Sequence, residues 1–379
     1  MMDISLKPIV IMKLAYIINT LNGTSGIIRM VTLQANYFIS NYGYDIDFIL
    51  LQQSPKEITF FYDLNCKVNL HFINRKRNGV KHTFQKLKLL NKVLNKINPT
   101  IVMPVESNFF SLYLPYFTNS RFKYIYQRHD TKERNLKRLS GNLKISFGNT
   151  LKIFLLNLAG HKYDKFVILS DAHRADWKNL NNLIVIENPL TINDDRRKAR
   201  LDKKIVLAIG RSDPIKGFDM LLKSWSIVTL KYPDWRLKIV GVKATDNELK
   251  KQIDKLGINN SVEVQMPTKN IESIYLNSSI YVCSSRLEGF PLILLEAMSF
   301  GIPVISFDCK YGPSEIISDG IDGLLVPPND TNVLATSIIR LIEDDKLRSE
   351  FGDMAYNNIQ RYSKENIMLK WKDLFESIV

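Results

Sequence analysis

Short runs of apolar residues alternate along the chain with longer segments in which apolar residues recur every three or four positions. The short runs have the length and composition of buried β-strands, and the longer segments have the period of amphipathic helices. The pattern predicts strands over residues 13–19, 45–51, 99–105, 123–129, 165–170, 183–188, 204–210, 236–241, 280–285 and 302–307. Helices are predicted between several of these strands, among them residues 82–97 and 218–230. Strands that alternate with helices favour parallel sheets with βαβ crossovers, and therefore an α/β fold.

One polar segment interrupts this alternation near the middle of the chain. Residues 191–203 are rich in charge and lack hydrophobic periodicity, and a new strand begins at Lys204. A chain of 379 residues is long enough for two domains. We therefore predict two doubly wound, Rossmann-like domains facing across a cleft, with a ligand at the carboxyl ends of the strands. The predicted boundaries are 1–190 for the first domain, 191–203 for the linker, 204–360 for the second domain and 361–379 for a closing helix.

The composition is that of a globular protein, with 45% hydrophobic and 24% charged residues. No apolar run approaches the roughly 20 residues that span a bilayer. The first apolar segment is interpreted as a strand and not as a signal peptide, and Met12 is an alternative start to Met1. The three cysteines are isolated and have no metal-ligand spacing, which is typical of a reducing cytoplasm. They are Cys66, Cys283 and Cys309.

The excess of positive charge lies entirely in the first half of the chain. Residues 1–190 carry 26 Lys and Arg against 12 Asp and Glu, whereas residues 191–379 carry 26 against 26. Such asymmetry indicates an anionic partner for the first half, which could be a membrane leaflet, an anionic glycolipid or nucleic acid. The alternative is that the lysines only solvate a surface.

Two glutamates, Glu288 and Glu296, stand eight positions apart in the segment SSRLEGFPLILLEAMSFGIPVISF. A turn separates them and a helix follows, so part of the spacing is loop and both carboxylates can face one ligand. The N–H groups at the start of such a helix suit a phosphate. A carboxylate on each side of a phosphate site suits a sugar nucleotide. From spacing alone, a buried βα unit with one capping and one surface glutamate is equally compatible.

This segment resembles the E-x7-E signature of the family-4 retaining glycosyltransferases, which have the GT-B fold. The resemblance implies that Glu288 contacts the donor sugar and that Glu296 binds the ribose hydroxyls. It also implies that the intervening backbone holds the diphosphate. That backbone belongs to Gly289, Phe290, Pro291 and Leu292.

Two cations follow the strand at 204–210. Arg211 and Lys216 flank the turn RSDPIKG, and Gly217 allows a tight entry into the next helix. From the residues alone they either neutralise a diphosphate or are solvated on a loop. The stretch resembles the G-R-x4-K-G element of the same family, in which both residues bind the donor phosphates. Preorganised cations imply catalysis without a metal or cofactor. The D-x-D of Asp45 and Asp47 lies at the entry of a strand and is interpreted as structural.

In the first domain, a glycine loop precedes the helix that follows the first strand, and Gly26 is assigned near the donor phosphates. The family often has Gly-Gly-x-Glu-Arg here, whereas this chain has Ser25 and Ile28 at the first-glycine and glutamate positions.

His129 follows a strand and is predicted to position the acceptor hydroxyl or the donor sugar, or else to be structural. The apolar stripe of helix 82–97 is expected to pack on the sheet, with its lysines facing outward to anionic lipid. These are Lys81, Lys86, Lys88, Lys92 and Lys96.

Taken together, these features predict a cytoplasmic retaining glycosyltransferase, peripheral at the inner face of the cell membrane. It would move a hexose-type sugar from a nucleoside diphosphate donor, a UDP-sugar, to a membrane glycolipid or growing cell-surface glycan. Residues 308–330 resemble enzymes of lipid-linked oligosaccharide, capsule or lipopolysaccharide synthesis. GT-B relatives also imply that the closing helix packs back on the first, acceptor-binding domain.

Two other functions remain open at this stage: a sugar-nucleotide epimerase on the same fold, and a non-catalytic subunit that binds a sugar nucleotide or a glycan. A nucleic-acid partner is not expected, because the sequence carries no recognition motif for one.

Overall fold

The structure is a computed structural model that describes residues 12–23, 25–51, 60–73, 80–105, 109–129, 157–177, 179–192, 195–243 and 245–379. The chain forms two compact units, one of Met1–Ile186 with Met368–Val379 and one of Glu187–Ile367. Of the two possible start residues, Met1 lies outside the described residues and Met12 is the first described residue.

The segment that was expected to link the domains, 191–203, belongs to the second unit. Its backbone is fixed there, because the Ala199 N–H donates to the Phe300 carbonyl at 2.8 Å. The closing helix is α13 (Lys364–Ile378), and its residues from Met368 onward group with the first unit.

The first unit is a parallel α/β sheet with seven strands in the order β3-β2-β1-β4-β5-β6-β7. Its strands are β1 (Lys13–Ile18), β2 (Asp45–Leu50), β3 (Asn69–Phe72), β4 (Ile101–Pro104), β5 (Lys123–Gln127), β6 (Lys165–Ile168) and β7 (Leu183–Val185). Its helices include α1 (Gly26–Tyr42), α2 (Val80–Ile97), α3 (Phe109–Phe117) and the 3-10 helix η1 (Asp171–Trp177). The order reverses between β1 and β4, which makes this a doubly wound sheet.

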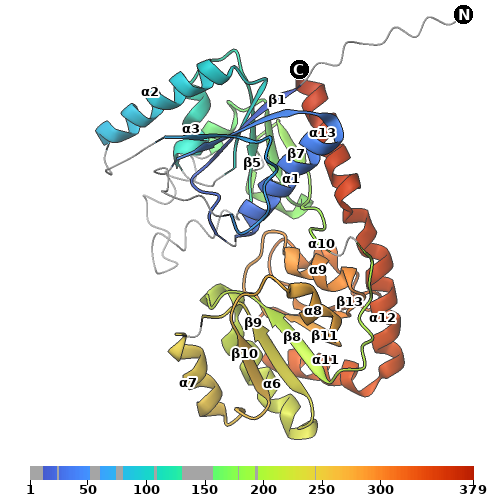
Figure 1. The fold of residues 1–379 in the computed structure, drawn as a ribbon. Helices are drawn as coiled ribbons and strands as arrows, with labels where there is room; N and C mark the ends of the chain where they lie inside the picture. The colour runs from blue at the N-terminus through green and yellow to red at the C-terminus, as the bar shows by residue number, and fades with distance from the viewer. Residues whose placement is uncertain are drawn as a thin grey trace, which may run out of the picture. The chain divides into compact units, whose positions relative to one another are not determined.

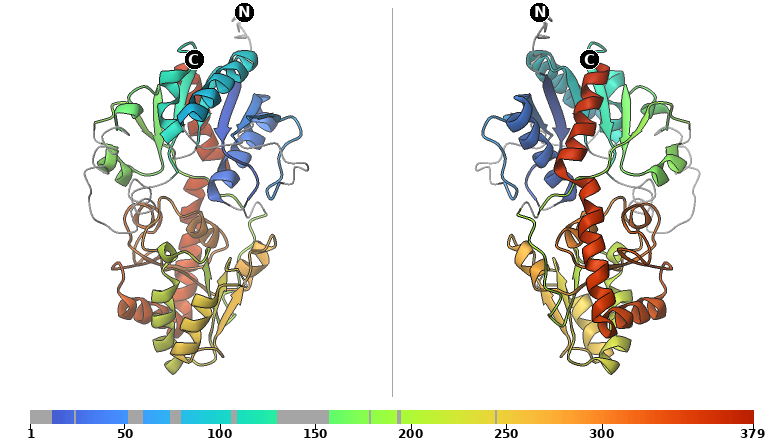
Figure 2. Two further views of the ribbon diagram at one scale, coloured as in Figure 1. Left: turned by 90° about the vertical axis from the view of Figure 1, so that its left-hand side faces the viewer. Right: turned by 90° about the vertical axis from the view of Figure 1, so that its right-hand side faces the viewer.

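Helices cover both faces of this sheet. Helix α2 and η1 pack on one face, around buried residues such as Leu90 and Trp177. On the other face lie α1 and the end of α13, where the rings of Phe38 and Phe375 are 5.2 Å apart. The two views of Figure 2 show α2 before the sheet from one side and α13 before it from the other.

The amphipathic helix at residues 80–97 matches its prediction in part. Leu87, Leu90 and Leu94 are buried in the core, as expected, and Lys88, Lys92 and Lys96 are exposed. Lys86, however, is buried, contrary to the prediction. The long aliphatic stem of a lysine can pack against apolar neighbours while only its ammonium reaches a polar group. The side chain of Lys81 lies outside the described residues.

The D-x-D pair lies at the start of β2 and binds neighbouring side chains. Lys13 lies 2.8 Å from Asp45, and His71 Nε2 lies 2.6 Å from Asp47 Oδ1. Hydrogen bonding to Asp45 raises the pKa of Lys13. Lys13 and Asp45 are the first residues of β1 and β2, at the amino ends of parallel strands and away from the ligand-binding edge.

The second unit is a parallel sheet of six strands in the order β10-β9-β8-β11-β12-β13. The strands are β8 (Ile205–Ile209), β9 (Arg236–Val240), β10 (Val262–Gln265), β11 (Ile280–Cys283), β12 (Val304–Phe307) and β13 (Gly323–Val326). The helices are η2 (Pro214–Lys216), α6 (Phe218–Lys231), α7 (Asn247–Leu256), α8 (Ile271–Leu276), α9 (Leu292–Ser299), α10 (Pro313–Ile316), α11 (Thr331–Glu343), α12 (Asp345–Asn358) and η3 (Ile359–Tyr362). Figure 1 shows how they flank the sheet.

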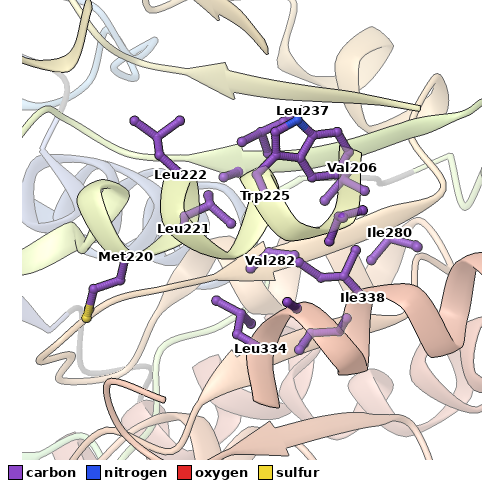
Figure 3. Packing of buried hydrophobic residues seen from close by; sticks show 14 of the residues in the cluster. Val206, Met220, Leu221, Leu222, Trp225, Leu237, Ile280, Val282, Leu334 and Ile338 are labelled. Carbon is purple, nitrogen blue, oxygen red and sulfur yellow. The ribbon is translucent and has the colours of Figure 1, made fainter. Parts of the chain in front are cut away.

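One face of this second sheet packs against α6 and α11. Trp225 of α6 is fully buried among strand residues such as Leu237, and Leu334 and Ile338 approach from α11 (Figure 3). The Trp225 indole N–H donates to Ser261 Oγ at 3.0 Å, so its polar atom is satisfied. Each fully buried aliphatic side chain stabilises the unit by about 1.5–3 kcal/mol. This rigid core positions the loops that leave the carboxyl ends of β8 and β11.

All ten strands predicted from the sequence are present, with ends that differ by a few residues. The predicted helices at 82–97 and 218–230 are also present, as α2 and α6. Within the described residues, no helix is long and apolar enough to cross a membrane.

Candidate active site

Two loops of the second unit meet where its strand order reverses. Residues 210–217 follow β8 and residues 284–291 follow β11, and these two parallel strands are direct neighbours in the sheet. In open α/β sheets, ligands bind at this position, outside the carboxyl ends of the strands. Arg211, Lys216 and Glu288 therefore lie where a ligand is expected.

The first loop folds around a single glycine. Asp213 begins η2 by accepting a hydrogen bond from the Ile215 N–H at 3.0 Å, and Gly217 ends it with a φ of +65°. A Cβ atom at Gly217 would lie 2.0 Å from the carbonyl oxygen of Ser284. Only glycine fits this close approach of the two loops.

Hydrogen bonds join the two loops directly. Ser284 Oγ donates to the Lys216 carbonyl at 2.9 Å, and the Arg286 N–H donates to the Ile215 carbonyl at 2.7 Å. The Arg286 guanidinium also forms a two-pronged pair with Asp219, with distances of 2.8 and 2.6 Å. This pair lowers the pKa of Asp219 and raises that of Arg286. The backbone that carries Lys216 is thus fixed to the backbone that carries Glu288.

Lys216 and Glu288 form an ion pair at the centre of the site. Lys216 Nζ donates to Glu288 Oε1 at 2.7 Å, and Ser285 Oγ donates to the same oxygen at 2.6 Å. Both charged side chains are partly exposed, Lys216 by 23% and Glu288 by 12%. Within the described part of the chain, both hydrogen bonds of the Glu288 carboxylate go to Oε1, so Oε2 can accept one from a ligand.

Arg211, the second predicted cation, lies next to Gly210 at the end of β8 and is exposed. Among the described residues, the ion pairs of this region join Lys216 to Glu288 and Arg286 to Asp219, and Arg211 takes part in neither. Its guanidinium is therefore not neutralised by a neighbouring carboxylate, and it can bind an anion that enters this edge of the sheet.

The loop at residues 289–291 leads into helix α9. Pro291 is the N-cap and supplies no side-chain hydrogen bond to the first turn. The backbone at Gly312 packs closely against this loop. A Cβ atom added at Gly312 would lie 2.4 Å from Pro291 Cδ and 2.9 Å from the Gly289 carbonyl oxygen. Phe290 is buried, and its carbonyl accepts a 3.4 Å hydrogen bond from Asn188 Nδ2. The start of α9, including Leu292, is thereby fixed with its N–H groups available to an anion.

Glu296 lies in the second turn of α9, and its environment differs from what the sequence indicated. The side chain is only 3% exposed. Its two oxygens accept hydrogen bonds from Thr191 Oγ1 at 3.1 Å and from the Tyr275 hydroxyl at 2.9 Å. Sequence reasoning missed both of these partners, as well as Ser285. The hydrogen bond of a hydroxyl-bearing residue cannot be predicted from motif spacing when its acceptor lies far away in the sequence.

The remaining predicted residues belong to the first unit. Gly26 is the first residue of α1, whose N-cap Ser25 accepts a 3.4 Å hydrogen bond from the Ile28 N–H. His129 lies two residues beyond the end of β5. His129 thus lies at the carboxyl end of β5, and Gly26 begins the helix that follows β1.

Two buried thiols lie beside the second-unit site. Burial raises the pKa of Cys283 and of Cys309, which makes both thiols poor nucleophiles. No three His, Cys, Asp or Glu side chains in the described ranges are arranged to hold a metal ion. That the protein needs no metal stays a prediction.

The sequence of this unit matches a known family over most of its length. Residues 191–358 match the family described as "Glycosyl transferases group 1". These residues belong to that family. The predicted resemblance is therefore confirmed, and the loops at β8 and β11 are those of a glycosyltransferase domain.

Two relatives show how far the sequence similarity extends. An uncharacterized glycosyltransferase of Haemophilus influenzae is 28% identical over 356 residues, which cover 93% of this chain and 97% of that protein. The amylovoran biosynthesis glycosyltransferase AmsD of Erwinia amylovora is 33% identical over 234 residues. That match covers 59% of this chain and 64% of AmsD.

Two solved structures share the fold. Sucrose-phosphate synthase from Thermosynechococcus elongatus has a TM-score of 0.81 at 16% identity, and the match covers 97% of this chain and 99% of the other. A TarM mutant of S. aureus, solved with UDP, has a TM-score of 0.75 at 17% identity, with 96% and 99% covered. Both support the predicted GT-B fold of two Rossmann-like domains.

Proposed function

We propose that this glycosyltransferase is a retaining, metal-independent enzyme that transfers a hexose-type sugar from a UDP-sugar to a membrane glycolipid or a cell-surface glycan. The observation that supports this most directly is the Lys216–Glu288 pair at the strand reversal of the second sheet, with a distance of 2.7 Å. In this pair, a cation that can bind a diphosphate lies next to a carboxylate that can accept a hydrogen bond from a sugar hydroxyl.

The diphosphate leaves more easily when its developing charge is neutralised. Lys216 supplies one positive charge, Arg211 a second, and the first N–H groups of α9 supply partial positive charge. Because Lys216 is fixed by the hydrogen bonds to its loop and to Glu288, it needs little reorganisation during the reaction. Removing one such group typically raises the barrier by about 3–4 kcal/mol.

The donor sugar is positioned by Glu288. Its Oε1 is occupied by Lys216 and Ser285, which fixes the carboxylate plane and leaves Oε2 for a sugar hydroxyl. A charge-assisted hydrogen bond of this kind distinguishes sugars by the orientation of one hydroxyl.

In the transfer step, the bond from the anomeric carbon to the phosphate oxygen breaks and the bond to the acceptor oxygen forms on the same face. The acceptor hydroxyl gives its proton to the departing phosphate oxygen, so no separate base is required. His129 of the first unit would orient the acceptor hydroxyl or the donor sugar.

Ribose would bind at Glu296. A carboxylate oxygen can accept more than one hydrogen bond, so the Thr191 and Tyr275 hydroxyls do not exclude a ribose hydroxyl. Since the carboxylate is 3% exposed, binding requires a small local opening around it. Gly26 of the first unit would contribute a backbone N–H near the phosphates.

The names of similar proteins favour the donor and the acceptor class. The TarM structure was solved with UDP, and AmsD is named for the synthesis of amylovoran. The exposed lysines of α2 (Lys88, Lys92 and Lys96) accompany Leu89, which is 47% exposed. Each such lysine near an anionic leaflet contributes about 1 kcal/mol of binding. This supports a peripheral enzyme on the cytoplasmic membrane face.

The test is nucleotide release from UDP-, GDP- and dTDP-sugars, with and without a membrane glycolipid extract and with and without a chelator. We expect release from one UDP-sugar that rises sharply with extract, persists in chelator and collapses in Lys216→Ala and Glu288→Gln. Conversion of the donor without any acceptor would indicate an epimerase instead. Binding without turnover of any donor would indicate a binding subunit, and both outcomes overturn the proposal.

A further inference from the structure

A second site, unrelated to the donor loops, lies at the opposite edge of the second sheet. It is a hollow of about 510 Å³ lined by the segment that leads into β8 and by Leu276 and Asn277, which precede β11. The proposed donor loops follow the other ends of these same two parallel strands. Since β8 is five residues long, the two edges are separated by roughly 16 Å of strand. Figure 1 labels both strands and α8, which ends at Leu276.

The side chains that line the hollow carry a net positive charge. The lining contains Arg197, Lys198, Arg200 and Lys203 against a single carboxylate, Asp202. Leu276 is its only apolar side chain apart from aliphatic stems. A hollow of this composition has little to offer a nucleobase or another apolar group, and it favours a ligand with concentrated negative charge.

The four cations are not equally neutralised. Arg197 pairs with both Asp195 and Glu272, and Lys198 lies 2.8 Å from Asp353. Lys203 is only within 3.9 Å of Asp202, and no ion pair joins Arg200 to any residue in the described ranges. Arg200 and Lys203 are therefore the two cations whose positive charge a bound anion would neutralise.

The backbone that carries these cations is fixed. The Ala199 N–H donates to the Phe300 carbonyl at 2.8 Å, and the Arg348 guanidinium donates to the Leu201 carbonyl at 3.4 Å. Arg196 and Leu201 have φ values of 55° and 58°, in the left-handed region that costs a non-glycine residue about 1–2 kcal/mol. The backbone of this segment is therefore set before a ligand binds, which lowers the backbone entropy lost on binding.

From these observations we propose that the hollow binds a phosphate-bearing anion, with Arg200 as the main ligand and Lys203 as the second. The arginine fork can hold two phosphate oxygens at once, while the lysine acts as a point charge. The phosphate could be free in solution or part of an anionic lipid at a membrane surface. The hollow is independent of the donor site, so it stands or falls separately from the proposed function.

The test compares Arg200→Ala/Lys203→Ala with Lys250→Ala/Lys251→Ala, which removes two exposed charges from α7 of the same unit. Pyrophosphate binding is titrated by calorimetry with saturating UDP present, so that the donor loops do not contribute. Co-sedimentation with vesicles containing phosphatidylglycerol forms the second arm. Circular dichroism and nucleotide release from the donor confirm that each variant is folded.

We expect the Arg200/Lys203 variant to weaken binding at least tenfold in one arm, while the α7 variant behaves like the wild type. A loss in the pyrophosphate arm identifies a soluble phosphate, and a loss confined to the vesicle arm identifies lipid phosphate. If the wild type binds neither probe, or if both variants weaken binding equally, the hollow is not a phosphate site. Unchanged nucleotide release in the Arg200/Lys203 variant keeps this result separate from any failure at the donor loops.

Discussion

The first six strands of the first unit's sheet follow the same order as the six strands of the second, but the two units hold the loops at their strand reversal in different ways. In the second unit, the loops after β8 and β11 are joined across 68 and 72 residues by the bonds Ser284–Lys216 and Lys216–Glu288. Donor chemistry needs several groups within one small volume, and long-range bonds of this kind fix such groups relative to one another.

In the first unit, the turn after β1 is held by local contacts. The Asn22 N–H donates to Thr20 Oγ1 at 2.9 Å, and Ser25 caps α1 through the Ile28 N–H. This half of the chain also carries the whole excess of positive charge, 26 Lys and Arg against 12 Asp and Glu over residues 1–190. One fold thus fixes its loops by long-range bonds in one unit and by local bonds in the other, and we predict that the positive charge of the first unit acts without a fixed constellation of side chains.

The sharpest test of this contrast compares Lys216→Ala with His129→Ala. We expect Lys216→Ala to lower kcat by about 10²–10³-fold, because it removes a preorganised charge from the departing diphosphate. His129→Ala should raise the KM for the acceptor and lower kcat far less. Steady-state kinetics with donor and acceptor varied separately would measure both effects.

The matched control is Lys223→Ala, which removes an exposed lysine from α6 of the same unit and should leave kcat unchanged. If His129→Ala lowered kcat as much as Lys216→Ala does, the first unit would carry chemistry of equal weight and the contrast would be wrong.

The close approach of the two loops is tested by Gly217→Ala against Gly257→Ala. Both glycines have nearly the same φ, +65° and +67°, but an added Cβ meets the Ser284 carbonyl oxygen at 2.0 Å in one case and nothing within 4 Å in the other. Gly257→Ala should cost about 1–2 kcal/mol for its left-handed backbone alone. Gly217→Ala should cost about 3 kcal/mol and abolish turnover, since a backbone carbonyl cannot yield.

Urea denaturation of both variants measures these costs. Equal losses of stability would show that the loops are not in close contact.

The fold was largely predictable, and the strands that were missed share a position in their sheets. The pattern did not predict β3, β10 or β13, and each of these lies at an edge of its sheet. Polar residues interrupt the apolar signal of β3, NLHF, and of β10, VEVQ. β13, GLLV, is mostly buried, but it is only four residues long and directly follows the turn residues Asp319–Asp322. Buried strands carry their signal in a few consecutive residues, which is why all ten predicted strands were found.

The site was predictable only where a motif lies within one loop. Lys216 and Glu288 were identified from their own segments, and the structure then brought them within 2.7 Å. The partners of Glu296, Thr191 and Tyr275, come from 105 and 21 residues away, and nothing in their local sequence indicates that contact. Contacts of this kind are set by tertiary packing and cannot be derived from spacing.

A smaller effect is expected at Ser285, which shares Glu288 Oε1 with Lys216. Ser285→Ala should lower kcat/KM for the donor by about tenfold, because the carboxylate loses one of the two donors that orient it. Ser285→Thr keeps the hydroxyl and should restore most of the activity. If alanine and threonine gave the same kinetics, the hydroxyl would have no role in positioning Glu288.

The smallest expected effect concerns acid pH and the Arg286–Asp219 pair, which joins the loop after β11 to the first turn of α6. The pKa of Asp219 is lowered by Arg286, so the pair contributes stability above the ordinary aspartate pKa of about 3.9 and loses it as the pH falls through the lower, folded value. Both side chains are about one-third exposed, which limits the contribution to below about 1 kcal/mol.

Asp219→Asn should therefore be slightly less stable than the wild type at pH 7 in urea denaturation, and the difference should shrink toward pH 2. The exposed Asp254→Asn of α7 serves as the control. A difference that stays constant with pH would mean that this contact stabilises the site through hydrogen bonding and not through charge. It would then resemble the uncharged contacts that hold the turn after β1 in the first unit.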